Sequence, residues 1–217
     1  MNLQELRDLY RLRSGDRIVP YFCSDDEVDA WANEAEAEAC RRAHLLVDSS
    51  SEVTYVDVPA NGQVLAIDER IIGIRRARLV TANRRLAPIV VRDMDDRYPN
   101  WESATASAPL VFIPDYESGA ICLYPPAATA DVVRLTVVRT PLEAMACDED
   151  SPEIPSRYHP GLVHYILSEA YNKQDADLFD PKKAEQHALM FAAEFGAKSS
   201  AINERWALEQ YYGIGET

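Results

Sequence analysis

The chain has 217 residues, of which 47% are hydrophobic and 27% charged, so it can bury a core and form one or two domains. This composition excludes disordered and fibrous proteins. The 36 acidic residues outnumber the 22 basic ones, and the formal net charge of -14 argues against DNA reading as the main role. No stretch matches the roughly 20 apolar residues of a membrane span, and the N-terminus lacks a secretion signal, so we expect a soluble, unsecreted protein. Four scattered cysteines without a CxxC pair indicate neither a zinc site nor a disulfide framework, which fits a reducing cytosol.

Apolar residues recur at helical spacing at the start of the chain. The spacing predicts a short helix over residues 2–12, stopped by Ser14-Gly15-Asp16, and a longer helix that starts at Ser24 and runs to Leu46. Ser24 and Glu27 have the spacing of a capping box, in which each side chain accepts a hydrogen bond from the backbone amide of the other.

Short β-branched runs replace the helical period between Glu52 and Thr140, which predicts β structure. The predicted strands cover residues 53–58, 63–67, 71–80, 109–114, 120–124 and 132–139. Asn61-Gly62, between the first two strands, favours a hairpin with a type I′ turn. A single helical turn is predicted at residues 93–98. Because no crossover helix separates the strands, we expect antiparallel pairing.

The helical period returns near Pro155 and predicts two further helices. The second begins after an N-cap at Asp180, and its apolar stripe passes Gly196 and reaches Ile202 and Trp206. We therefore predict an α+β fold in which residues 1–48 and 143–217, from both chain ends, form a helical bundle with an inserted antiparallel β domain at residues 49–142. Residues 208–217 lose the period and contain two glycines, which predicts a flexible C-terminal docking tail.

The sequence contains no recognisable catalytic or metal-binding motif. His159 and His164 lie five residues apart without an HExxH carboxylate, so we interpret them as ordinary helix residues, and His44 and His187 as isolated ones. The start of a calcium loop is resembled by three acids, Asp175, Asp177 and Asp180. The central glycine of such a loop is missing, however, and Gln186 replaces its bidentate glutamate. The carboxylates at residues 148–150 fit a solvated linker better than an acid–base pair. We expect no enzyme activity, no cofactor and no metal.

Charge is segregated along the chain. Seven acids and no base lie between Ser24 and Cys40, whereas seven arginines and no acid lie between Arg70 and Arg92. The acidic face comprises Asp25, Asp26, Glu27, Glu34 and Glu38, and the candidate partner interface comprises Arg70, Arg75, Arg76, Arg78, Trp206, Tyr211 and Tyr212. One interpretation is a solvated helix face and a protected strand edge. The other is that the two surfaces meet on neighbouring copies in an assembly, whereas contact of the arginines with DNA phosphates is disfavoured by the net charge.

Several segments rich in proline, aromatic and aliphatic residues have a distinctive order and spacing. They are Tyr98-Pro99-Asn100-Trp101, Ala108-Pro109-Leu110-Val111-Phe112-Ile113, Ile121-Cys122-Leu123-Tyr124-Pro125-Pro126, residues 135–141, Ile154-Pro155-Ser156-Arg157-Tyr158-His159 and residues 180–195. In these segments the chain resembles the head–tail adaptor, or connector, proteins of tailed bacteriophages. Before Glu52 the chain matches these proteins only in being helical.

The resemblance implies a structural protein that forms a ring of about twelve copies between portal and tail. The implied partners are the portal protein, a tail or nozzle protein and neighbouring copies, while genomic DNA passes through the lumen without specific binding and no membrane is involved. The implied location is the head–tail junction of the virion, and the host cytoplasm before assembly. Two alternatives stay open: a neck or tail-completion protein that binds only the tail side, and a small host enzyme whose site the sequence does not reveal.

Overall fold

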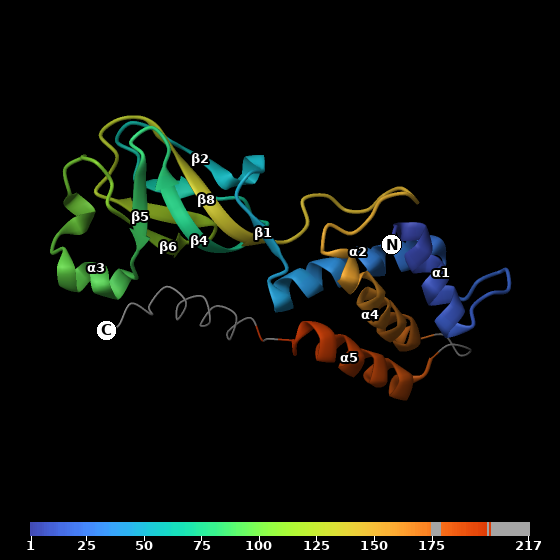
Figure 1. Cartoon of the computed structure of the whole chain (residues 1–217). Helices are drawn as coiled ribbons and strands as arrows, with labels where there is room; N and C mark the ends of the chain where they lie inside the picture. The colour runs from blue at the N-terminus through green and yellow to red at the C-terminus, as the bar shows by residue number, and fades with distance from the viewer. Residues whose placement is uncertain (175–178, 199, 201–217) are drawn as a thin grey trace. The chain divides into compact units, whose positions relative to one another are not determined.

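The computed structural model describes residues 1–174, 179–198 and 200 (Figure 1). It confirms a mixed α+β protein, and the described residues form five α-helices and a curled eight-stranded sheet. The described residues fall into two compact units. The helical unit comprises Met1–Leu46 and Thr140–Lys198, and the β unit is centred on Val47–Arg139.

The first two helices begin at side-chain caps. Helix α1 spans Leu3–Ser14 and is capped by Asn2, and α2 spans Asp25–Ala43. The predicted capping box at the start of α2 is present: the Glu27 amide donates to Ser24 Oγ over 3.2 Å, and the Ser24 amide donates to Glu27 Oε2 over 2.8 Å. Helix α2 ends at Ala43 and does not reach Leu46, because His44 adopts a left-handed conformation (φ 51°).

The C-terminal helices of the helical unit are α4, His159–Asn172, and α5, Pro181–Phe195, with a 3₁₀ turn at Ser156–Tyr158 before α4. Asp180 caps α5 as predicted, since its carboxylate accepts from the amides of the second and third helical residues. The helix does not pass Gly196, whose positive φ of 97° ends it. Residues Ile202, Trp206 and 208–217 lie outside the described residues.

Helix α4 lies at the centre of the helical unit and packs against α1, α2 and α5 (Figure 1). The shared core includes Leu3, Leu6, Tyr10, Val28, Ala32, Ala35, Leu162, Val163, Ile166, Phe191 and Phe195. Helix α4 is apolar on most sides because it has helical neighbours on three of them. No helix within the described parts of the chain combines the length and hydrophobicity that a membrane span requires.

The strands of the β unit are β1 Leu46–Asp48, β2 Tyr55–Val58, β3 Val64–Ala66, β4 Ile71–Leu79, β5 Arg84–Pro88, β6 Val111–Glu117, β7 Ala120–Tyr124 and β8 Asp131–Arg139. Their order in the sheet is β1-β8-β4-β5-β6-β7-β3, and β2 also pairs with β8. The predicted inward face of β8, formed by Val133, Leu135 and Val137, is fully buried. Helix α3, Val91–Arg97, and short 3₁₀ turns at Glu52–Thr54 and Trp101–Ser103 complete this unit.

Two predictions about the strands are wrong. The expected hairpin at Asn61-Gly62 does not form, because β2 pairs with β8 and β3 pairs with β7. Asn61 and Gly62 instead exchange backbone hydrogen bonds with Ala127, and only Asn61 has a positive φ. The pairing is also not antiparallel throughout, since β5 and β6 pair in parallel. The helical turn predicted at residues 93–98 is present as α3, and the segment that contains it is a crossover between these two strands.

Candidate interaction surfaces

A row of arginines crosses three adjacent strands of the β unit. Arg78 on β4 lies opposite Arg85 on β5 and opposite Arg134 on β8. Directly paired residues in a sheet point to the same face, and all three side chains are exposed. The row therefore concentrates like charge on the outer face of the sheet, an arrangement that opposes folding and suits a negatively charged partner.

An irregularity in β4 adds two more arginines to this face. Between the pairs Ile74–Val137 and Arg76–Thr136 the register shifts by one residue, so that β4 contains one residue more than β8. A bulge of this kind re-aims a side chain, and here Arg75 and Arg76 are both exposed between two buried residues. We call the set Arg75, Arg76, Arg78, Arg85 and Arg134 the arginine surface.

Most of the arginine surface has no internal counter-charge. Among the described residues, no carboxylate lies within ion-pair distance of Arg75, Arg76, Arg78 or Arg85. Arg134 donates from Nε to the Ser49 carbonyl over 2.9 Å and lies over the ring of Tyr55. Arg70, the remaining predicted interface arginine of this region, differs: its guanidinium pairs with Asp68 at 2.7 Å and lowers the pKa of that carboxyl to about 2.

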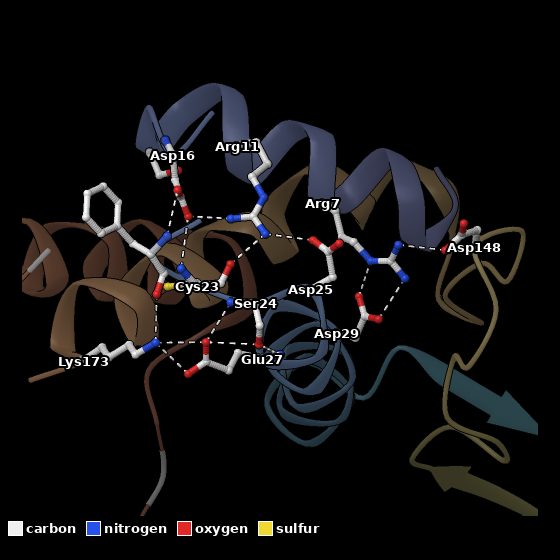
Figure 2. Close-up of polar contacts among 12 residues, drawn as sticks. Arg7, Arg11, Asp16, Cys23, Ser24, Asp25, Glu27, Asp29, Asp148 and Lys173 are labelled. Carbon is white, nitrogen blue, oxygen red and sulfur yellow. Dashed lines mark hydrogen bonds and ion pairs between the residues drawn. The ribbon is translucent and has the colours of Figure 1, made fainter. Parts of the chain in front are cut away.

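The acidic residues of α2 are largely paired within the helical unit (Figure 2). Glu27 contacts Lys173 at 2.8 Å, and this hydrogen bond lowers the pKa of Glu27. Asp25 accepts from Arg11 at 2.8 Å, and Asp29 accepts from Arg7. The pKa of the Arg7 guanidinium is raised, chiefly by its hydrogen bond to Asp29.

The later acids of α2 are also held in place. Glu38 contacts both Arg41 and Arg42 at 2.8 Å, and Glu36 is buried and accepts from the Ile154 amide. Glu34 and Asp26 are exposed, and Asp26 has no ion-pair partner among the described residues. The acidic face that remains open to a partner is thus narrower than the sequence alone indicates.

Residues 148–150 lie on a largely exposed loop, as predicted, but this loop also binds the start of α1. Asp148 accepts from Arg7 Nη1 over 2.7 Å, and the carbonyls of Asp148 and Asp150 accept from the first free amides of α1, those of Gln4 and Leu3. The Asp150 carboxylate accepts from two backbone amides of its own loop, which lowers its pKa. This loop satisfies donors that a helix N-terminus leaves unpaired.

A buried polar cluster fixes the loop between α1 and α2 (Figure 2). Asp16 is 2% exposed and accepts from Arg11 and from the amides of Phe22 and Cys23, the latter two over 3.0 and 3.2 Å. Arg11 also donates to the Cys23 carbonyl over 2.7 Å. Lys173, the residue that follows α4, donates to the Phe22 carbonyl over 2.9 Å. These contacts close the loop at both ends.

The histidines of α4 and α5 make close contacts within the helical unit. His159 is buried, with Nε2 2.8 Å from the Ile154 carbonyl. His187, predicted to be isolated, instead stacks on His164, with their Nδ1 atoms 3.0 Å apart. Burial lowers the pKa of His164 to about 4, helped by the charge of Arg13 and by His187. Within the described residues, no group of three or more His, Cys, Asp or Glu side chains is arranged to hold a metal ion.

A comparison with known protein families shows which family the chain belongs to. A family model described as SU10 adaptor protein matches residues 1–210. The chain belongs to the SU10 adaptor protein family. The resemblance to phage head–tail adaptors is thereby confirmed, and it extends over the N-terminal helices, which the sequence motifs had not covered. No curated protein is significantly similar in sequence to the adaptor.

The adaptor is thus a phage structural protein. The predicted interface contains Arg75, Arg76 and Arg78. Arg85 belongs to the basic run of the sequence but not to the predicted interface, and Arg134 belongs to neither, because their place beside Arg78 depends on strand pairing between distant segments. Trp206, Tyr211 and Tyr212 lie outside the described residues.

Proposed function

We propose that the adaptor forms a closed ring of about twelve copies between the portal and the tail of a phage, and that the genome passes through its lumen. The observation that carries this proposal is the family match over residues 1–210. In this proposal the helices from both chain ends act as one bundle, and residues 49–142 act as an inserted domain. The net charge of -14 per copy supports a lumen that does not retain DNA.

The ring requires an interface that joins two different surfaces of neighbouring copies. The arginine surface and the acidic face of α2 have opposite charge and lie in different units of the chain. We propose that they meet across this interface, with the exposed carboxylates of Asp25, Asp26 and Glu34 facing the arginines. Because exposed charges are screened by salt, association should weaken as ionic strength rises.

Electron microscopy of the adaptor mixed with its portal tests the proposed function. A ring on the portal that is continuous with a central channel is the expected result. Binding only to isolated tails would support a neck or tail-completion protein instead. A stable monomer that binds neither portal nor tail at micromolar concentrations would contradict the adaptor role and reopen the case for an enzyme.

Charge reversal tests the interface separately. Replacing Arg75, Arg76 and Arg78 by glutamate should abolish ring formation without unfolding the chain, because these side chains are exposed. Arg97→Glu is the matched control, since Arg97 is an exposed arginine on α3, outside the arginine surface. Unchanged assembly of the triple variant would contradict the interface but not the adaptor role.

A further inference from the structure

The loop between α1 and α2 presents an unusual apolar surface. We call residues 17–22 the apolar loop; Ile18 is 82% exposed and Val19 74% exposed, and Tyr21 and Phe22 are 41% and 45% exposed. Large aliphatic side chains at a loop tip are unfavourable in water because their apolar surface stays hydrated. Such a surface is expected where a partner covers it.

The apolar loop is held rigidly. The contacts of Asp16 and Lys173 close its two ends, and the Arg11 guanidinium lies 3.8 Å from the centre of the Tyr21 ring. A loop fixed in this way loses little conformational entropy when it binds. Its shape is therefore prepared for docking before the partner arrives.

The β unit has a groove of complementary character. Strands β2 and β3 follow each other in the chain but pair with different strands, and the space between them is a groove of about 630 Å³. We call it the β2–β3 groove; it is lined by Val56, Val64, Leu65 and Ile67 among others, with Val64 44% exposed. The groove is large enough for several aliphatic side chains.

The apolar loop and the β2–β3 groove also match in charge and in the position of their neighbouring surfaces. Two exposed acids, Glu52 and Asp57, line the β2–β3 groove together with the Asp68–Arg70 ion pair, so the charge of the lining is negative. The apolar loop begins with Arg17, which is exposed and has no ion-pair partner among the described residues. Tyr55 lies at the boundary of the groove, beneath Arg134 of the arginine surface. The apolar loop itself is followed in the chain by the acidic start of α2.

We propose that the apolar loop of one copy inserts into the β2–β3 groove of a second copy. This inference rests on the proposed ring and names its apolar contact. Ile18 and Val19 fill the groove, Arg17 faces its acids, and the acidic start of α2 then reaches the arginine surface beside it. Because loop and groove are different surfaces, each copy can give its loop to one neighbour and receive a loop from the other, as a closed ring requires.

Cysteine cross-linking between two different variants tests this contact. One variant carries Val19→Cys and the other Val64→Cys, both in a Cys147→Ser background, because Cys147 is the exposed cysteine among four that are otherwise buried. The two variants are mixed with the portal and oxidised. A covalent dimer should form in the mixture and not with either variant alone. Val80→Cys, 47% exposed on the β unit but outside the groove, replaces Val64→Cys as the control and should give no dimer.

A substitution at the loop tip provides the second readout. Ile18→Asp should leave the fold intact and weaken self-association at least tenfold, whereas Leu12→Asp, at a 58% exposed position on α1, should leave it unchanged. Rings seen by electron microscopy without the mixed dimer would overturn the loop contact and leave the ring in place. A cross-link within single chains carrying both cysteines, or loss of portal binding by Ile18→Asp with self-association unchanged, would also overturn it. Absence of both ring and cross-link would overturn the ring together with the inference.

Discussion

Replacing Asp16 by alanine should destabilise the helical unit by about 3 kcal/mol. The side chain is 2% exposed and serves three donors: Arg11 and the amides of Phe22 and Cys23. Breaking a buried ion pair costs about 3–5 kcal/mol when the remaining charge has no other partner. Arg11 keeps Asp25 and the Cys23 carbonyl, which reduces this penalty. The unpaired Cys23 amide adds about 1–3 kcal/mol, whereas the more exposed Phe22 amide can bind water.

Hydrogen exchange measured by mass spectrometry, at increasing urea concentrations, is the suitable assay. It reports on the peptides of each unit separately, and a chain with two compact units does not guarantee one unfolding transition. Asp16→Asn should lose only about 1–2 kcal/mol, because the amide oxygen still accepts hydrogen bonds. Asp8→Ala, at an exposed position on α1, should change stability by less than about 0.5 kcal/mol. A loss below about 1 kcal/mol for Asp16→Ala, with unchanged protection of the Cys23 amide, would refute the assigned role of Asp16.

Three further predictions concern the arginine surface, the histidine pair and the C-terminal segment. Arg78→Thr should raise the free energy of unfolding of the unassembled chain by about 0.2–1 kcal/mol, because it removes the like charge between Arg85 and Arg134. A decrease in thermal melts would show that the three arginines do not repel one another. Since the folded pKa of His164 lies near 4, below its ordinary 6.5, the unfolded chain binds more protons between these values. Stability should therefore fall by about 2 kcal/mol as pH drops from about 6.5 to 4, and His164→Gln should flatten that profile in urea titrations. Truncation after Leu208 should leave the melting temperature nearly unchanged but abolish portal binding measured by co-sedimentation, whereas a large drop in melting temperature would place Tyr211 and Tyr212 in the core.

Local signals in the sequence predicted the parts of the fold that depend on neighbouring residues. The capping box of Ser24 and Glu27, the cap at Asp180 and the bounds of β7 were correct because caps and β-branched runs act over a few residues. Strand β5, Arg84–Pro88, was missed because its polar sequence buries only Leu86 and shows no alternating pattern.

Long-range pairing accounts for the remaining errors. Asn61-Gly62 favours a hairpin turn, but β2 pairs with β8 and β3 pairs with β7. These pairings depend on distant residues, so local turn chemistry does not predict them. The apolar loop was not predicted either, because an apolar run ordinarily indicates a buried segment. The exposed fractions of its side chains show that this run faces outward, and the contacts of Asp16 hold it there.

The central place of α4 has a consequence for synthesis on the ribosome. Helices α1 and α2 leave the ribosome first, but α4 and the loop at residues 148–150, on which they pack, are made only after the whole β unit. The β unit can fold before α4 is made, and during that time the apolar faces of the first two helices remain uncovered. A chain that stops before α4 therefore leaves α1 and α2 without their main partner, and only chains translated past α4 complete the core of the helical unit.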